Sequence, residues 1–128
     1  MSNKRTVLVI EDDKGISEVI RTLFLMNDID AVFASNGYAG LQLLASGNID
    51  MIICDYMLPD INGDKIITQV KANPFTASIP FIFLSAFADA DDVNNGLALG
   101  AELYITKPFS APHLISVVKE KLNTIPNL

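Results

Sequence analysis

The sequence predicts an α/β fold in which an open sheet of parallel strands carries helices on both faces. Three observations support this prediction. Apolar, β-rich segments alternate with helix-like segments along the chain, and Asn, Gly and Pro residues fall in the gaps. Three of the β-rich segments are continuous apolar runs, which suit strands buried on both faces. Strands that alternate with helices are joined by right-handed crossovers, which build a parallel sheet between two helical layers.

Five segments are predicted to be strands: residues 6–10, 31–34, 51–54, 81–84 and 103–105. Five stretches with apolar residues at helical spacing lie between and after them. Their apolar positions are Ile16, Val19, Ile20 and Leu23; Tyr38, Leu41 and Leu44; Ile66, Ile67 and Val70; Val93 and Leu97; and Leu114, Val117, Val118 and Leu122. The fourth helix is predicted to be mobile, because Asn94, Asn95 and Gly96 are adjacent and glycine costs about 1 kcal/mol relative to alanine.

Length and composition are those of one globular domain. A chain of 128 residues, half of them apolar, supplies one core, so we expect a single domain over residues 1–128, with its core over about 5–122 and a frayed end over 123–128. The net charge of −6 and the absence of a Lys/Arg cluster argue against direct nucleic-acid binding. The apolar runs are too short to span a membrane, the single Cys54 cannot form an internal disulfide, and no signal-peptide pattern follows Met1. We therefore expect a cytoplasmic protein.

Polar side chains follow four of the predicted strands at the points where the strands end. An acidic triplet (residues 11–13) follows the first strand, Asp55 the third, Ser85 the fourth, and Lys107 comes just after the fifth. Functional groups of an open α/β sheet gather beyond the carboxyl ends of its strands. The sequence therefore predicts one site that contains carboxylates, a hydroxyl and an ammonium group.

Carboxylates that are brought together stay ionised only where a cation offsets their repulsion. Mg²⁺ is the expected ion, with Mn²⁺ as the alternative, because it takes oxygen ligands from a few carboxylates, waters and phosphate oxygens. Taken singly, each residue has a plainer explanation, and Asp13 is as well explained as a cap of the next helix. The combination of carboxylates, a hydroxyl and an ammonium group in one site favours phosphoryl transfer, in which the protein mainly positions and neutralises the transferred group. Asp55 is then the nucleophile.

The chain resembles the receiver domain of bacterial two-component response regulators, the family of the chemotaxis regulator, from Arg5 to about Leu122. Four stretches in order carry the resemblance: VLVIEDD (7–13), DYMLPDING (55–63), LSA (84–86) and GAELYITKPF (100–109). The resemblance implies a flavodoxin-like, doubly wound fold, with five parallel strands in the order 2-1-3-4-5 and five helices in three α/β/α layers. It implies a signalling phosphoacceptor that catalyses only its own phosphorylation and slow autodephosphorylation.

The resemblance also implies residue roles. Asp55 is the phosphoacceptor, which becomes 4-aspartylphosphate. Glu11 and Asp12 bind the metal together with Asp55, and Asp12 is the more direct ligand of the pair. Asp13 is the alternative ligand if the acidic triplet aligns with the family motif one residue further along. The backbone carbonyl of Met57 is a further metal ligand.

Further roles concern the phosphate and the switch. Ser85 and Lys107 contact the phosphoryl group, and the Lys107–Pro108 bond is expected to be cis, an isomer that is energetically accessible before proline. Tyr104 matches the switch aromatic, with a simple core aromatic as the alternative. Ser85 moves toward the phosphate and Tyr104 turns inward, which reshapes the surface of the fourth helix, fifth strand and fifth helix.

Two positions depart from the commonest members of the family. Met57 and Phe87 stand two residues after Asp55 and Ser85, where many relatives have polar residues that orient an attacking water. Both are apolar here. We therefore expect the acyl phosphate to be shielded from water and long-lived.

The phosphoryl donor is expected to be another molecule, because the only histidine, His113, falls in the first turn of the fifth helix, away from the strand ends. The resemblance implies a sensor histidine kinase or a histidine phosphotransfer protein, and a small phosphodonor also suits the site. We expect a monomer or a weak, phosphorylation-dependent dimer, with no membrane partner. The sequence is compatible with a stand-alone regulator, with a phosphorelay intermediate and with part of a larger regulator or hybrid kinase. It does not identify the downstream effector.

The sequence argues against three other classes of function. An aspartyl-phosphate hydrolase needs an acid two residues after the nucleophile, and that position is Met57. A flavin or dinucleotide binder needs a glycine-rich loop after the first strand, where this chain is acidic. A receiver fold that serves only as a binding module does not need the intact set of Asp55, Ser85 and Lys107.

Overall fold

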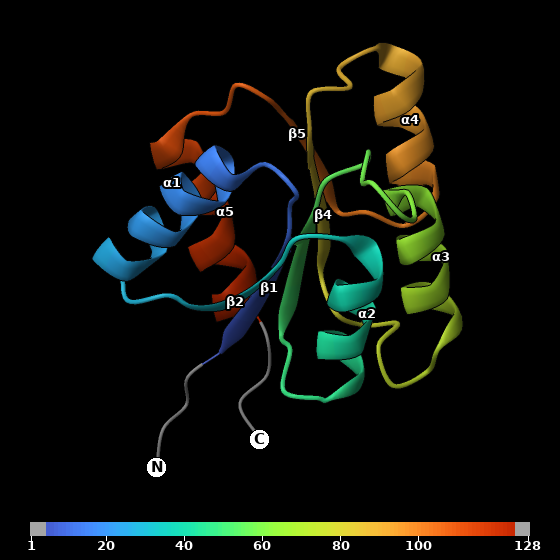
Figure 1. The fold of residues 1–128 in the computed structure, drawn as a ribbon, viewed down its shortest axis with the longest axis horizontal. Coiled ribbons are helices and arrows are strands. Elements are labelled where there is room, and N and C mark those ends of the chain that lie inside the picture. The colour runs from blue at the N-terminus through green and yellow to red at the C-terminus, as the bar shows by residue number, and fades with distance from the viewer. Residues whose placement is uncertain (1–4, 125–128) are drawn as a thin grey trace.

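The protein has three layers, a parallel sheet between two groups of helices (Figure 1). The computed structural model describes residues 5–124; the predicted frayed end therefore lies mostly outside the described residues. The strands are β1 (Thr6–Ile10), β2 (Asp30–Ala34), β3 (Met51–Cys54), β4 (Phe81–Ser85) and β5 (Leu103–Thr106). The helices are α1 (Lys14–Met26), α2 (Gly37–Ala45), α3 (Gly63–Ala72), α4 (Ala90–Ala98) and α5 (Ala111–Asn123).

The strand order is β2-β1-β3-β4-β5 and every pairing is parallel. This confirms the predicted doubly wound fold. The helices α1 and α5 lie on one face of the sheet, and α2, α3 and α4 lie on the other (Figure 1). The order reverses at β1, so the ends of β1 and β3 lie side by side, with Ile10 opposite Cys54.

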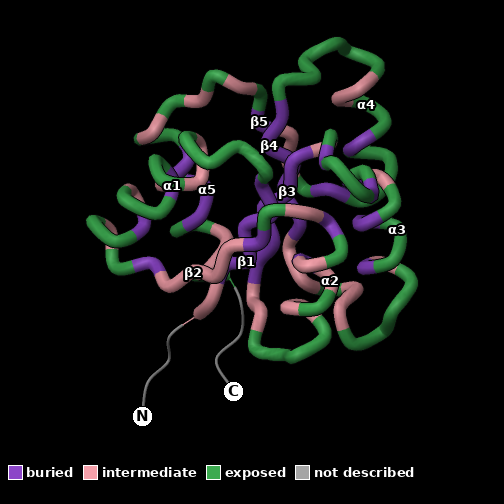
Figure 2. Tube along the Cα trace, in the orientation of Figure 1, coloured by how far each residue is buried: buried purple, intermediate pink, exposed green. Residues whose placement is uncertain are grey.

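Alternate side chains of the central strands fill two separate cores. Val7, Val9, Ile53 and Leu84 pack toward α1 and α5. Leu8, Ile10, Ile52, Phe81 and Phe83 pack toward α2 and α3. The central strands are therefore buried on both faces, as their continuous apolar runs predict (Figure 2).

Two predicted strands end one residue too early. Ser85 and Thr106 are the last residues of β4 and β5, where they pair with each other, and the N–H of Lys107 donates to the carbonyl of Ser85 at 2.9 Å. A third strand, β2, begins one residue earlier than predicted, at Asp30 opposite Thr6. Backbone pairing does not depend on side-chain polarity, so an apolar run underestimates a strand that ends in a polar residue.

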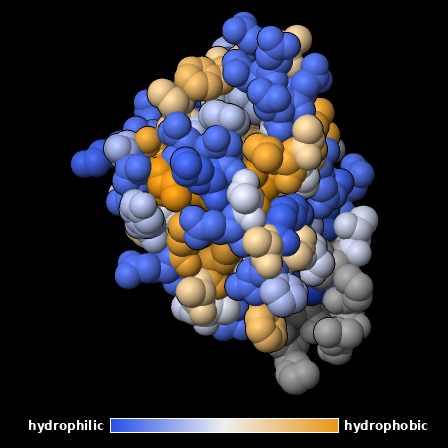
Figure 3. Space-filling model, turned by 90° about the vertical axis from the view of Figure 1, so that its right-hand side faces the viewer, coloured by the Kyte–Doolittle hydropathy of each residue, from blue (hydrophilic) through white to orange (hydrophobic). Residues whose placement is uncertain are grey.

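The side of the molecule that carries α3 and α4 is mostly hydrophilic, with several apolar patches (Figure 3). Among the described residues, none of the helices has both the length and the apolar character that a membrane span requires.

Candidate functional site

Three carboxylates meet at the carboxyl edge of the sheet. Glu11 directly follows β1, Asp55 directly follows β3, and Asp12 lies beside them; one oxygen of each lies within 4.8 Å of the others. Glu11 and Asp55 are buried, whereas Asp12 is exposed. The structure therefore brings together the three acidic side chains that the sequence assigns to a metal.

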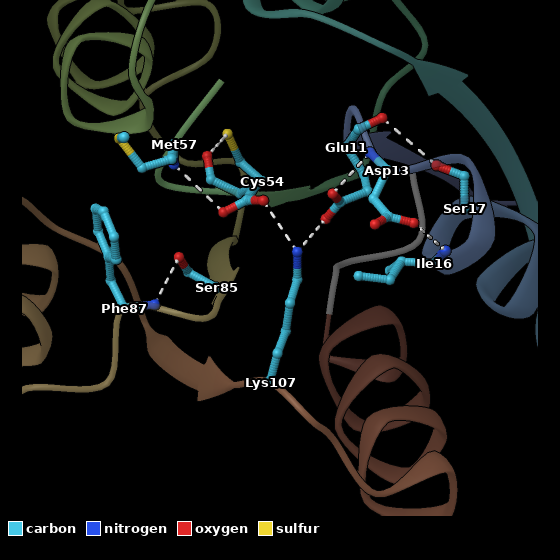
Figure 4. A network of polar contacts seen from close by, with 10 residues as sticks. Glu11, Asp13, Ile16, Ser17, Cys54, Met57, Ser85, Phe87 and Lys107 are labelled. Atoms are coloured by element: carbon cyan, nitrogen blue, oxygen red, sulfur yellow. Dashed lines mark hydrogen bonds and ion pairs between the residues drawn. The ribbon is translucent and has the colours of Figure 1, made fainter. Parts of the chain in front are cut away.

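Lys107 reaches these carboxylates from the end of β5. Its ammonium lies 2.7 Å from Glu11 Oε2 and 2.9 Å from Asp55 Oδ2 (Figure 4). Desolvation alone lowers the pKa of Lys107, but its hydrogen bonds to Glu11 and Asp55 outweigh that effect and raise the pKa. Burial raises the pKa of Glu11, and the hydrogen bond from Lys107 only partly opposes this. Lys107 therefore stays charged and supplies a fixed cation.

The donor set fits a hard divalent cation. Three carboxylates and one ammonium carry formal charges of −3 and +1, which leave two negative charges for a further cation to offset. All of the clustered donors are oxygens, which Mg²⁺ prefers. The exposed side chain of Asp12 leaves one side of the cluster open to waters and to an incoming phosphate.

The third acid of the triplet has a different place. The carboxylate of Asp13 accepts a hydrogen bond from the N–H of Ile16 at 3.0 Å and so caps α1. The N–H of Asp13 donates to Glu11 Oε1 at 3.1 Å, and this bond orients the buried carboxylate (Figure 4). The side chain of Asp13 is thus a helix cap, which was one of its two predicted roles.

Backbone groups hold Asp55 in place. Its N–H donates to the carbonyl of Ile10 at 3.0 Å, and its Oδ1 accepts from the N–H of Met57 at 3.3 Å. The Cys54 thiol donates to the carbonyl oxygen of Asp55 at 3.1 Å, and burial raises the pKa of this thiol well above its usual value. Cys54 is therefore an inert core residue beside the site.

Ser85 and Tyr104 lie on the β4 and β5 side of the cluster. The buried hydroxyl of Ser85 accepts from the N–H of Phe87 at 3.2 Å (Figure 4). The hydroxyl of Tyr104 is buried and makes no well-formed hydrogen bond among the described residues. Burial raises the pKa of Tyr104, and a weak interaction with Ser85 opposes this only in part. The Lys107–Pro108 bond is cis, the isomer that the resemblance implies.

Met57 and Phe87 lie at the rim of the site, with 50% and 38% of their surfaces exposed. The single histidine, His113, lies in the first turn of α5, where its N–H donates to the capping hydroxyl of Ser110. It is separate from the carboxylate cluster.

Two features around the site are not indicated by the sequence. Asp60 connects the loop after β3 to α2 through backbone N–H groups, and no sequence pattern marks a backbone donor that lies 22 or 23 residues away. The ring of Phe83 packs between those of Tyr56 and Tyr104 in tilted arrangements, with centroid distances of 5.3 and 5.6 Å. The aromatic residues themselves are visible in the sequence, but their contact depends on the pairing of β3, β4 and β5.

Two curated relatives of this chain are transcriptional regulatory proteins. The chain is 36% identical over 113 residues to the transcriptional regulatory protein DltR of Streptococcus agalactiae, which covers 88% of this chain and 50% of that protein. It is 32% identical over 118 residues to the phosphate regulon transcriptional regulatory protein PhoB of Pseudomonas aeruginosa, which covers 92% and 52%. The chain thus spans about half the length of these curated relatives.

Solved structures agree with this relationship. A putative response regulator from Chloroflexus aurantiacus superposes with a TM-score of 0.89 at 29% identity, over 94% of this chain and 99% of that one. The receiver domain of the Francisella response regulator 1452 gives 0.87 at 34% identity, over 94% and 98%. Residues 7–119 match the family described as the response regulator receiver domain. With its acidic cluster and its 2-1-3-4-5 sheet, the chain therefore belongs to the receiver domain family of response regulators.

Proposed function

We propose that this chain is the phosphoacceptor of a two-component phosphorelay. It receives a phosphoryl group on Asp55 from a sensor histidine kinase or a histidine phosphotransfer protein, in a reaction that requires Mg²⁺ or, in its place, Mn²⁺. One observation carries the proposal: the buried carboxylate of Asp55 contacts Lys107 and lies within 4.8 Å of the oxygens of Glu11 and Asp12.

In the transfer, a carboxylate oxygen of Asp55 forms a bond to phosphorus while the bond from phosphorus to the donor nitrogen breaks. Glu11, Asp12, Asp55 and the backbone carbonyl of Met57 are the proposed metal ligands. When bound, Mg²⁺ neutralises phosphoryl oxygens and so lowers their repulsion of the attacking carboxylate. The ammonium of Lys107 lies 2.9 Å from the carboxylate of Asp55. It is therefore close enough to contact an oxygen of the phosphoryl group once that group is attached to Asp55.

The phosphorylated state is read through Ser85 and Tyr104. Ser85 donates its hydroxyl to a phosphoryl oxygen and gives up its bond from the N–H of Phe87. Tyr104 responds to this movement, and the surface formed by α4, β5 and α5 changes with it. The hydroxyl of Tyr104 supports this role, because a buried polar group without a well-formed hydrogen bond among the described residues is poorly stabilised in one position.

The wider context completes the proposal. The chain acts as a single receiver domain, with its core over about residues 5–122, in the cytoplasm and as a monomer or a weak, phosphorylation-dependent dimer. Its output passes to a protein partner or to an attached domain, and this domain does not itself bind nucleic acid. The acidic net charge of −6 supports the last point.

The test is incubation with Mg²⁺ and a small acyl phosphate, followed by mass spectrometry of the intact protein. We expect one added phosphoryl group, lost in Asp55→Asn and after removal of Mg²⁺ with a chelator. Asp13→Asn is the matched control, because asparagine also caps helices well, and it should be phosphorylated like the wild type. No phosphorylation of the wild type overturns the proposal in favour of a binding module; rapid turnover without accumulation favours a hydrolase.

A further inference from the structure

We infer that Asp60 is a positioning residue for the metal site: it fastens the loop that follows Asp55 to the N-terminus of α2. We name residues 55–62 the acceptor loop; they join β3 to α3. The inference rests on the proposed function, because the backbone carbonyl of Met57 in this loop is one of the proposed metal ligands.

The contact is a carboxylate held by three backbone amides. The N–H of Gly37 donates to Asp60 Oδ1 at 2.8 Å, and the N–H of Tyr38 donates to Oδ2 at 2.9 Å. The N–H of Ile61 also donates to Oδ1, at 2.8 Å. Desolvation opposes the ionisation of Asp60, but these amides together outweigh it and lower its pKa. A charged carboxylate thus bridges two segments that are far apart in the sequence.

The amides belong to the positive end of α2, where backbone N–H groups lack partners within the helix. Asn36 supplies the local cap by accepting from the N–H of Ala39 at 2.8 Å. Asp60 therefore does not replace a missing cap. It satisfies the two amides that come before Ala39, and it does so from another part of the chain.

Side-chain packing strengthens the same contact. A Cβ on Gly37 would lie 2.2 Å from Ile61 Cγ2 and 3.0 Å from the Ile61 carbonyl oxygen. Only a glycine lets the start of α2 approach the acceptor loop so closely. The loop is thus held by hydrogen bonds at Asp60 and by close packing at Ile61.

The remaining contacts of the acceptor loop lead to Asp55. The N–H of Gly63 donates to the carbonyl of Tyr56 at 2.7 Å, which closes the loop, and the N–H of Met57 donates to Asp55 Oδ1 at 3.3 Å. Asp60 connects this closed loop to α2. The loop does not need to be ordered when a metal binds, because it is already held in place, and such preorganisation raises affinity. Groups that support metal ligands in this way typically change affinity by about 10 to 100-fold.

The experiment measures Mg²⁺ affinity by isothermal titration calorimetry in the wild type, Asp60→Asn and Asp60→Ala. We expect about tenfold weaker binding in Asp60→Ala, the low end for such supporting groups, and a smaller loss in Asp60→Asn, whose amide oxygen still accepts one bond. Asn36→Ala is the matched control, because it removes a cap from the same helix without touching the loop. It should bind Mg²⁺ within about twofold of the wild type while its melting temperature falls.

A second measurement separates positioning from general stability. Coupling between two sites is reciprocal, so Mg²⁺ should slow amide hydrogen exchange at Gly37 and Tyr38 in the wild type, and this effect should vanish in Asp60→Ala. Unchanged affinity in Asp60→Ala, or an equal loss in Asn36→Ala, overturns the inference. If the wild type itself does not bind Mg²⁺, the proposed metal site fails instead.

Discussion

The helices α3 and α4 follow neighbouring strands and begin alike, yet they are held very differently. Neither has a side-chain cap, and the first turn contains one acidic residue in α3 and two in α4. The helix α3 buries one face against the sheet, through Gly63, Ile66, Ile67 and Val70. In α4 the only buried residue is Gly96. Figure 2 shows the same contrast, with purple segments along α3 and mostly green along α4.

The loops that precede these helices differ in the same way. The loop before α3 is bonded to α2 through Asp60. In the loop before α4, the N–H of Phe87 donates to Ser85, only two residues away. This difference indicates that the two loops have different roles. The fixed side holds the groups around Asp55, while the loosely packed side can follow Tyr104, against which Gly96 packs.

The largest expected effect is on stability. Ile67 is fully buried in α3 and Leu97 is 41% exposed in α4. Ile67→Ala should lower the free energy of unfolding by about 3 kcal/mol, because it leaves a cavity, whereas Leu97→Ala should cost less than about 1 kcal/mol. Urea denaturation measures both values. Equal losses would mean that the two helices are packed equally well.

Glycine substitutions sharpen the contrast. A Cβ on Gly63 would lie 2.6 Å from the backbone oxygen of Asp55, whereas a Cβ on Gly96 would lie 2.9 Å from the ring of Tyr104. Gly63→Ala should therefore cost about 2 kcal/mol through overpacking against backbone. In Gly96→Ala the new Cβ also meets the buried ring of Phe83 at 3.0 Å, so both rings must shift. Alanine favours the helix by about 1 kcal/mol and offsets part of this cost, so the net loss should be smaller than in Gly63→Ala. Denaturation midpoints decide this, and a larger loss in Gly96→Ala would reverse the comparison.

The lifetime of the phosphorylated protein probes the two loops together. Met57 precedes α3 and Phe87 precedes α4, and both shield the acyl phosphate in our hypothesis. The double variant Met57→Asn, Phe87→Glu should lose its phosphate about tenfold faster, less than the 100-fold or more of a fully positioned general base. The decay is followed by mass spectrometry after the phosphodonor is removed. A wild-type lifetime of seconds that does not exceed that of the double variant contradicts the shielding.

Amide hydrogen exchange compares the helices without any substitution. We expect residues 93–97 of α4 to exchange faster than residues 66–70 of α3, with a local opening free energy lower by at least about 1 kcal/mol, the cost of one glycine in a helix. Uniformly high protection across residues 93–97 would contradict the predicted mobility.

The smallest expected effect is the pH dependence of the Asp60 contact. Desolvation raises the pKa of Asp60, but the backbone amides of Tyr38, Gly37 and Ile61 together outweigh it and lower the pKa below 3.8 in the folded protein. Its contribution to stability is therefore complete above pH 3.8 and is lost as the pH falls through the lower, folded-state pKa. The stability difference between wild type and Asp60→Asn should narrow in that acid range, as measured by urea denaturation. A constant difference would show that the charge is not involved.

The sequence predicts most of the site because the fold obeys a simple rule. The carboxyl ends of parallel strands share one edge, so recognising the strands was enough to group Glu11, Asp12, Asp55 and Lys107. The strand ends themselves were misplaced by one residue at Ser85 and Thr106, where backbone pairing continues past the apolar run. The role of Asp13 was left open between metal ligand and cap, and only its bond from Ile16 identifies the cap.

By itself, the sequence determined the fold class, the strand order through its family resemblance, and the chemistry gathered at one edge of the sheet. These follow from local patterns, namely apolar runs, helical spacing and the residues that end each strand. Only the tertiary structure decided how firmly each part is held. The carboxylate of Asp60 bonds to backbone amides 22 and 23 residues away, and Gly96 packs against Tyr104. Such contacts depend on how distant segments approach in space. The pattern of residue types does not show which backbone donors or side chains will meet.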